Sequence, residues 1–269
     1  MKIAELFYSL QGEGALVGVP SVFVRTSGCN LRCRWCDTPY TSWSPEGTDL
    51  ELGQIVEQVR AYPASHVVIT GGEQMIQTEL VALTGRLRAL GLHITIETAG
   101  TVSQPVECDL MSISPKLANS APTGSFAAQH NRLRIQPAVL LELMARYEYQ
   151  LKFVVENPAD LEEIRALVET LHAPRDRVIL MPEGTEPGPL AARARWLAEV
   201  CKQEDFRFSP RLHIDLWGSR RGVCAAGARH RLPLTELHGQ HRNRSALHAR
   251  CGEAGGVGRL ARGQHVQQR

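Results

Sequence analysis

Seven short β-rich runs occur within residues 1–222 of this 269-residue chain, and segments of helical periodicity separate most of them. The expected strands are Ser21–Thr26, His66–Thr70, His93–Thr98, Leu110–Ser114, Gln150–Val155, Arg177–Met181 and Leu212–Leu216. The expected helices are Leu52–Tyr62, Thr78–Leu90, Pro158–Leu171 and Pro189–Gln203. Strands and helices that alternate in this way predict an α/β domain with a mostly parallel sheet, either barrel-like or partly open.

Polar and glycine residues follow four successive strands at the point where each is expected to end. A cysteine-rich loop follows Ser21–Thr26, and Gly71–Glu73 follow the second strand. Glu97 lies near the end of the third strand, and Ser114–Lys116 close the fourth. Because the loops at the carboxyl ends of parallel strands converge, we expect the active site at this edge of the sheet.

Three cysteines, Cys29, Cys33 and Cys36, lie within eight residues of one another. Close thiolates suit zinc, copper(I) or an iron–sulfur cluster. A four-iron cluster ordinarily takes four cysteines, so three local ligands would leave one iron open to bind another molecule. A structural zinc site is the alternative, although such sites usually show two paired spacings far apart, and the other four cysteines here are isolated.

Apolar residues make up 43% of the chain, enough to bury a full core in one large domain. No apolar run approaches the roughly 18–20 residues that span a bilayer. An odd number of cysteines, seven, in a chain of this size with no signal peptide argues against structural disulfides. We therefore expect a soluble protein of the cytoplasm.

The charge balance changes sign near residue 222. Residues 223–269 carry eight arginines and two glutamates, a net charge of +6, whereas residues 1–222 carry 22 basic and 26 acidic residues, a net charge of −4. The basic segment lacks aromatic residues and cannot bury enough apolar surface to offset its ordering entropy, so we predict disorder. It is either an arm for nucleic acid or an out-of-frame extension of a GC-rich gene; we favour the second and expect no nucleic-acid binding.

Several polar residues near these strand ends are candidate ligands. Gly72 allows a close approach to the backbone, and the adjacent Glu73 carboxylate or free carbonyls could hold an ammonium group. Lys116 could hold a carboxylate or a ribose oxygen. Thr38, directly after the cysteine loop, is a plausible hard ligand for Mg2+. Each of these residues could instead belong to an ordinary turn or a solvated surface.

The segment Ser9–Gly14 combines an amide, a carboxylate and two glycines, as in a loop that reads the edge of a flat heterocycle. Gln11 and Glu13 supply the polar groups. Arg25, within an expected strand, could clamp a substrate carboxylate with two hydrogen bonds. The alternative is a glycine turn with Glu13 in solvent and Arg25 in a structural ion pair.

The run CNLRCRWCD, together with TGGE after the next strand, resembles the cluster loop of the radical S-adenosylmethionine superfamily. The motifs SLQGEG, CDT, IETAG, SPK, QLKFVV and RLHIDLWGSRRGV resemble, within it, the 7-carboxy-7-deazaguanine synthase family. The resemblance implies a reduced radical-SAM barrel in one domain, residues 1–222. It also implies contraction of 6-carboxy-5,6,7,8-tetrahydropterin with loss of ammonia, in the queuosine pathway.

The resemblance further implies the cofactors and the partners. A 4Fe-4S cluster, S-adenosylmethionine and Mg2+ are expected, with a flavodoxin- or ferredoxin-like electron donor and a homodimer. The implied cluster ligands are Cys29, Cys33 and Cys36, with Thr38 for Mg2+. The implied substrate contacts are Leu10, Gln11, Gly12, Glu13, Arg25 and Thr70. The implied S-adenosylmethionine contacts are Gly72, Glu73, Ser114, Pro115 and Lys116.

Two features depart from the family, and two other functions stay open. Gln74 stands where the family commonly has proline, and the chain continues for 46 residues past Val223, near which its members usually end. The first alternative function is another radical enzyme, such as one that activates a glycyl radical on a partner protein. The second is a zinc-stabilised nucleic-acid-binding module.

Overall fold

The protein is described by a computed structural model over residues 1–222, and residues 223–269 lie outside the described part. All described residues belong to one compact unit. None of the helices in this part is both long and apolar enough to cross a membrane. The predictions about the basic segment fall on residues outside the described part, so the boundary at residue 222 stays a prediction.

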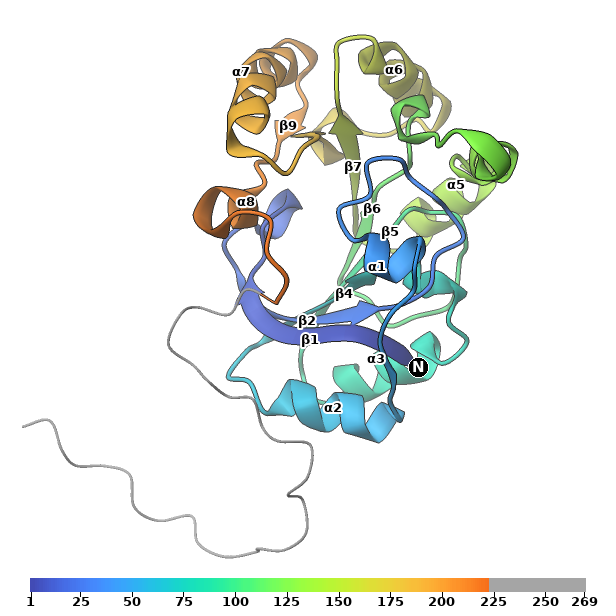
Figure 1. Ribbon diagram of the computed structural model, residues 1–269, viewed down its shortest axis with the longest axis vertical. Helices are drawn as coiled ribbons and strands as arrows, with labels where there is room; N and C mark the ends of the chain where they lie inside the picture. Colours follow the sequence, from blue (N-terminus) through green and yellow to red (C-terminus); the bar gives the residue numbers. More distant parts are fainter. Residues whose placement is uncertain (223–269) are drawn as a thin grey trace, which may run out of the picture. The chain divides into compact units, whose positions relative to one another are not determined.

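A nine-stranded sheet forms the centre of the described chain, in the order β3-β1-β2-β4-β5-β6-β7-β8-β9 (Figure 1). β1 pairs antiparallel with β2 and β3, and all other neighbours are parallel. The strands are β1 (Lys2–Leu10), β2 (Pro20–Thr26), β3 (Thr48–Asp49), β4 (His66–Gly71), β5 (His93–Thr98), β6 (Leu110–Ile113), β7 (Tyr149–Val155), β8 (Val178–Pro182) and β9 (Arg207–Phe208). The predicted α/β class and mostly parallel sheet are confirmed.

Helices connect most of the successive parallel strands, and four of them match the expected helices to within two residues at each end. α2 (Leu52–Arg60) begins with a capping box between Glu51 and Gln54, and it buries Ile55 and Val59. The other helices are α1 (Pro39–Ser42), α3 (Leu80–Arg88), α4 (Ala127–Leu133), α5 (Pro137–Arg146), α6 (Asp160–Thr170), α7 (Pro187–Glu204) and α8 (Leu212–Trp217). Short 3₁₀ helices are η1 (Gly14–Leu16), η2 (Gln74–Ile76), η3 (Ala118–Ser120), η4 (Gly124–Phe126) and η5 (Arg175–Arg177).

The prediction of a strand at Leu212–Leu216 is wrong, because this segment is helix α8. The amide of Ile214 donates to the carbonyl of Arg211 at 2.9 Å, as in a helical turn. Ile214 is 4% exposed whereas Leu216 is 51% exposed, so these residues do not share one buried face as they would in a strand. Five alternating residues are too few to separate the two periods, and β9 takes the edge beside β8.

The register of the parallel strands brings the four expected strand ends together. Thr26 pairs with Gly71 across β2 and β4, and Thr98 pairs with Ile113 across β5 and β6. Ile69 pairs with Ile96 in the middle of the same array and both are fully buried. The loops that follow these strands therefore leave the sheet at one edge, as the sequence predicted.

Gly71 ends β4 with φ of +129°, and a Cβ at this position would lie 2.1 Å from the carbonyl oxygen of Thr26. We expect Gly71→Ala to lower the free energy of unfolding by about 3 kcal/mol or more, because the clash is with the backbone of a paired strand. Urea denaturation measures this change. Gly85→Ala is the matched control, because its Cβ would meet open space within α3 and should stabilise by about 0.5–1 kcal/mol. Equal effects of the two substitutions would contradict the strand contact.

Candidate active site

A cavity of about 550 Å³ lies where the parallel strands end. This volume falls in the range of about 300–1,000 Å³ that is typical of small-molecule sites. The parallel strands β4 to β8, together with β2, all contribute to its wall. Those strand residues include Arg25, Thr70, Thr98, Ser112, Val154 and Met181. The segment after β1, the cysteine loop, and α8 with the residues that follow it supply most of the remaining wall.

All three cysteines of the loop line this cavity. Cys29, Cys33 and Cys36 belong to one small packed cluster with Leu31 and Ala99. Burial raises the pKa of the Cys29 thiol to about 11 and that of Cys33 to about 12. Because thiolates are the metal ligands, metal binding here would release protons.

The thiols suit a cluster that takes three protein ligands. These three are the only cysteines among the described residues that line the cavity. A four-iron cluster that they bind would therefore have one iron without a cysteine ligand, facing the open space. Within residues 1–222, no three or more His, Cys, Asp or Glu side chains are grouped so that they could hold a single metal ion. Cluster ligation has a different geometry, because each thiolate binds its own iron.

The cysteine loop packs directly on the turn after β4. A Cβ on Gly72 would lie 2.0 Å from the carbonyl oxygen of Gly28, so only glycine allows this approach. The amide of Glu73 donates to the same carbonyl at 2.9 Å. Asn30, inside the loop, donates to the hydroxyl of Thr101 at 3.0 Å. The close contact between Gly72 and Gly28 therefore sets the position of the loop that carries the cysteines.

The carboxyl group of Glu73 lies beneath the cavity and not in its lining, apart from the other residues that were expected to contact a ligand. It is 0% exposed and does not belong to the lining. It accepts hydrogen bonds from the Thr98 hydroxyl at 2.8 Å and from the Ala99 amide at 2.9 Å. Burial raises its pKa. Glu73 therefore stabilises the turn that presents Gly72.

Pro115 and Gln74, two other residues singled out in the sequence, are also buried. Pro115 is buried outside the lining, although Ser114 and Lys116 on either side of it line the cavity. Gln74 is 0% exposed, and its side-chain amide donates to the backbone carbonyl of Glu97. This contact joins the turn after β4 to β5 at the position where the family commonly has proline.

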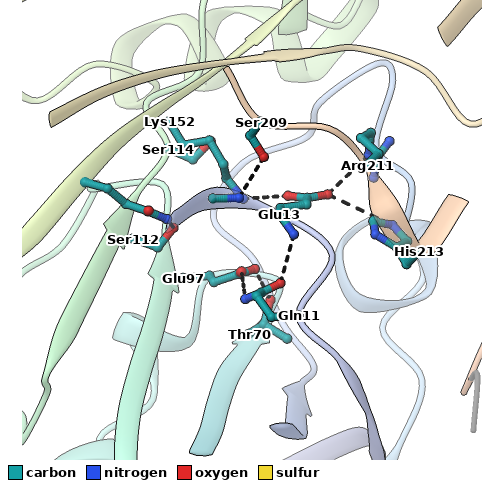
Figure 2. Close-up of polar contacts among 12 residues, drawn as sticks. Gln11, Glu13, Thr70, Glu97, Ser112, Ser114, Lys152, Ser209, Arg211 and His213 are labelled. Carbon is teal, nitrogen blue, oxygen red and sulfur yellow. Dashed lines mark hydrogen bonds and ion pairs between the residues drawn. The ribbon is translucent and has the colours of Figure 1, made fainter. Parts of the chain in front are cut away.

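A chain of hydrogen bonds links the segment after β1 to β4 and β5 (Figure 2). The Gln11 side chain donates to Glu97 Oε1 at 3.1 Å, and the Thr70 hydroxyl donates to Glu97 Oε2 at 3.0 Å. The side-chain oxygen Oε1 of Gln11 in turn accepts from the backbone amide of Glu13 at 3.2 Å. All four residues line the cavity, so Glu97 orients the polar groups of Gln11 and Thr70 there.

Glu13 lies between three basic side chains, as Figure 2 shows. Lys152 Nζ is 2.5 Å from Glu13 Oε2, Arg211 Nε is 3.2 Å from Oε1, and His213 Nε2 is 4.0 Å from Oε1. Burial alone would raise the pKa of Glu13, but the charges of Lys152 and Arg211 outweigh it and hold the pKa well below its usual range. Glu13 is therefore ionised throughout the neutral pH range.

Arg211 joins Glu13 to the cysteine loop. Its guanidinium pairs with Asp37, which lies between Cys36 and Thr38, and donates to the carbonyl of Gly184 at 2.7 Å. The Asp37 and Glu13 charges keep the pKa of Arg211 raised, even though burial acts in the opposite direction. This one buried side chain therefore connects the segment after β1, the cysteine loop and the loop after β8.

Arg25 and Thr38 lie on the cavity wall near α1. Arg25 Nε is 2.9 Å from Glu5 Oε2, and the Tyr40 hydroxyl donates to the same Glu5 oxygen at 2.9 Å. Thr38 precedes α1, with its hydroxyl 3.9 Å from Cys36 Sγ. The structural ion pair considered for Arg25 is therefore present, and Arg25 also lines the cavity.

The structure brings the predicted residues together with two exceptions, Glu73 and Pro115. The polar lining residues without a role assigned from the sequence include Lys152, Arg211 and His213. A lysine inside the apolar run QLKFVV was the visible signal for Lys152. Arg211 and His213 lie in the motif RLHIDLWGSRRGV, but only the tertiary structure brings them to Glu13. Residues Ser219–Gly222 also line the cavity.

Comparisons with known proteins agree with this geometry. The model of the radical SAM superfamily matches residues 23–116. The chain is 47% identical over 232 residues to the 7-carboxy-7-deazaguanine synthase of Halobacterium salinarum, covering 81% of this chain and 90% of that protein. It is 43% identical over 226 residues to the enzyme of the same name from Rhodopirellula baltica, covering 82% and 88%. The crystal structure of QueE from Escherichia coli matches with a TM-score of 0.60 at 28% identity, covering 79% of this chain and 94% of that one.

The buried charge of Glu13 should make stability depend on pH. Its folded-state pKa is lowered, so as the pH falls the unfolded chain takes up the proton first, near its usual value of about 4.3. The contribution to stability is therefore complete above about pH 5 and is lost below it. Glu13→Gln should cost about 3 kcal/mol at pH 7, because Lys152 and Arg211 lose a buried counter-charge, and less at pH 4.

Urea denaturation at pH 7 and pH 4 measures both values. Glu57→Gln, at an exposed ion pair with Arg60, is the matched control and should change stability by less than about 0.5 kcal/mol at either pH. A Glu13→Gln cost that did not shrink on acidification would show that the charge of Glu13 is not the stabilising feature.

Proposed function

The chain belongs to the 7-carboxy-7-deazaguanine synthase family of radical S-adenosylmethionine enzymes in the queuosine pathway, and we propose that the cavity described above is its active site. There it would convert 6-carboxy-5,6,7,8-tetrahydropterin into 7-carboxy-7-deazaguanine. Substrate and product differ by one ammonia, so the reaction needs no net oxidant. Family membership also makes the activation of a partner protein and the zinc-stabilised module unnecessary as explanations.

One observation carries this assignment: the three cysteines and the polar segment Gln11–Glu13 line the same cavity. The cluster and S-adenosylmethionine, which the family implies, would supply a radical that removes hydrogen from the substrate. The residues of this chain bind and orient the substrate, and they exclude water. Three thiols on one wall and hydrogen-bonding groups on another suit that division of work.

Glu13 and its neighbours would hold the flat ring of the pterin. The lowered pKa keeps the Glu13 carboxylate an acceptor for the N–H groups of an aminopyrimidine edge. A carboxylate has about four lone-pair sites, so acceptor capacity remains beside the bonds from Lys152 and Arg211. Leu10, Gly12 and Thr70 complete this wall, and a Cβ on Gly12 would lie 2.1 Å from His213 Nδ1. The glycine therefore leaves room for the imidazole.

Arg25 would bind the carboxylate of the substrate. Its ion pair with Glu5 fixes the guanidinium on the cavity wall, and a guanidinium can bind a carboxylate with two parallel hydrogen bonds. This placement would orient the substrate with its carboxylate toward α1 and its ring toward Glu13.

The S-adenosylmethionine contacts would come from the turn after β4 and the end of β6. Gly72, Ser114 and Lys116 line the cavity, and Lys116 Nζ donates to the Ser114 carbonyl at 2.6 Å and to its hydroxyl at 3.1 Å. These bonds hold a positive charge beside the cysteines. Glu73 and Pro115 would act indirectly, by shaping the backbone that presents the lining residues.

The remaining partners are proposed on the family resemblance. A flavodoxin- or ferredoxin-like protein would reduce the cluster, and the enzyme would act as a homodimer. Mg2+ would bind near Thr38, whose hydroxyl lines the cavity beside Cys36.

Anaerobic reconstitution with iron and sulfide, followed by an assay with 6-carboxytetrahydropterin, tests the function. We expect deazapurine absorbance from the unaltered chain and none from Cys33→Ala, because a cluster on two thiolates is poorly held. Cys108→Ala is the matched control, because Cys108 lies outside the cavity lining. This variant should keep the iron and sulfide content of the unaltered protein. An intact cluster with turnover of another substrate, and no deazapurine, would refute the proposed substrate.

Thr38→Ala tests the proposed Mg2+ site. We expect the Mg2+ concentration for half-maximal activity to rise about tenfold or more, corresponding to a lost contact of about 1.4 kcal/mol. S-adenosylmethionine binding, measured by equilibrium titration, should stay unchanged. Thr38→Ser keeps the hydroxyl and should retain the Mg2+ response. Equal losses of the Mg2+ response and of S-adenosylmethionine binding would contradict the assigned role.

A further inference from the structure

Two large aromatic side chains are exposed together beside the cysteine loop. Trp43 is 38% exposed and Phe126 is 41% exposed. Their rings form a T-shaped pair with centroids 5.6 Å apart. Trp43 directly follows α1 and Phe126 ends η4, so the pair joins segments that are distant in sequence. Neither residue belongs to the cavity lining, and the function described above does not use them.

This aromatic pair is bound directly to the backbone of the cysteine loop. The Trp43 indole donates to the carbonyl of Cys33 at 2.9 Å. The Arg32 guanidinium lies 5.4 Å from the centroid of the Phe126 ring and donates to the carbonyls of Cys29 and Leu31, each at 2.7 Å. We call Arg32, Trp43 and Phe126 the outer patch. It contacts the backbone of two cluster-ligand residues from outside the cavity.

The outer patch is held in a fixed position by His130 of α4. Its Nδ1 accepts from the amide of Arg32 at 3.1 Å, and its Nε2 is 2.9 Å from the hydroxyl of Ser120. Burial lowers the pKa of His130 to about 4, so the ring is neutral and accepts the amide hydrogen at neutral pH. The patch is therefore preorganised and would lose little conformational entropy when a partner binds.

The positive charge of the outer patch is that of Arg32. Of the other basic residues in the adjoining segments 25–36 and 116–134, Arg25 pairs with Glu5, Arg134 pairs with Glu163, and Lys116 lines the cavity. Arg32 donates to backbone carbonyls, so no carboxylate of the described residues neutralises it through these bonds. Arg34 does pair with Glu156, which leaves Arg32 as the charge at the centre of the patch.

We propose that the outer patch of Arg32, Trp43 and Phe126 is the docking surface for an acidic one-electron carrier protein that reduces the cluster. The proposal rests on the proposed function, since it requires a cluster on Cys29, Cys33 and Cys36. The reduced carrier loses one electron and the cluster gains it, with no bond made or broken. The cavity side of the loop is reserved for substrate, so the carrier approaches from the outside.

The size and chemistry of the patch suit a transient partner. Redox encounters use small interfaces, below about 1,200 Å², and do not need the larger surface of a permanent dimer. Aromatic residues and arginine are enriched at protein interfaces and carry most of their binding energy. Positive charge would steer an acidic carrier and align it before electron transfer.

The experiment compares two reductants on the reconstituted full-length enzyme. A reduced flavodoxin must dock, whereas sodium dithionite reaches the cluster without docking. Phe126→Glu adds a negative charge to the patch, and we expect it to lower the rate of cluster reduction by flavodoxin at least about tenfold at low salt, as for a lost interaction of about 1.4 kcal/mol. Reduction by dithionite, followed by the loss of cluster absorbance, should be unchanged.

Two control variants separate charge from folding. Phe126→Lys removes the same ring but leaves the patch positively charged. Its rate of cluster reduction by flavodoxin should therefore fall less than that of Phe126→Glu, and this rate should still decrease as the salt concentration rises. Phe208→Glu, at a residue of β9 that is 37% exposed, lies outside the patch and should not change the flavodoxin rate. The affinity for oxidised flavodoxin should follow the same order as the rates.

Three outcomes would overturn the proposal. Equal losses with flavodoxin and dithionite would mean that the patch only supports the cluster loop. An unchanged flavodoxin rate in Phe126→Glu would mean that the carrier docks elsewhere. A change from dimer to monomer in Phe126→Glu would mean that a second copy of the chain covers the patch. Failure of the pterin assay with dithionite would refute the proposed function alone, because cluster reduction is followed without substrate.

Discussion

The buried charge cluster around Glu13 is the interaction on which the arrangement of the cavity depends. Its members come from segments far apart in the chain: the loop after β1, strand β7, and the residues before α8. In the order of the sheet, β1 and β9 lie near opposite edges, yet Leu212 donates to the Gly12 carbonyl at 2.9 Å. The charges of Lys152 and Arg211 therefore hold together the two sides of an open sheet, and the space between them is the cavity.

A second constraint acts on the other wall, where glycine permits a contact between two backbones. Because Gly72 has no side chain, the turn after β4 lies directly against Gly28, at the start of the cysteine loop. Glu73 stabilises this turn from beneath with its buried carboxyl group. The same loop therefore presents its thiols to the cavity, and its backbone to the exposed aromatic pair on the outside. The active site and the proposed docking surface therefore lie on two faces of one loop.

Much of the fold followed from the sequence because its signals are local. The cysteine loop follows β2, Gly71–Glu73 follow β4, and Ser114–Lys116 follow β6. With β5, these strands form one parallel array, so their ends meet as expected. The segment Leu212–Leu216 was wrongly predicted because five alternating residues suit a strand or a helical turn equally. Glu73 was expected in the site because sequence does not reveal which side of a turn a carboxylate occupies.

The sequence by itself determined the class of fold, the three-cysteine loop and the family, since strand periodicity, cysteine spacing and motif order are properties of contiguous residues. Only the tertiary structure decided which charges meet. Glu13 and Arg211 are separated by almost the whole described chain, and Lys152 lies between them in sequence, so no periodicity connects the three. Their ion pairs form because the sheet brings the ends of the domain together, and burial in a region of low dielectric makes each charge depend on the others.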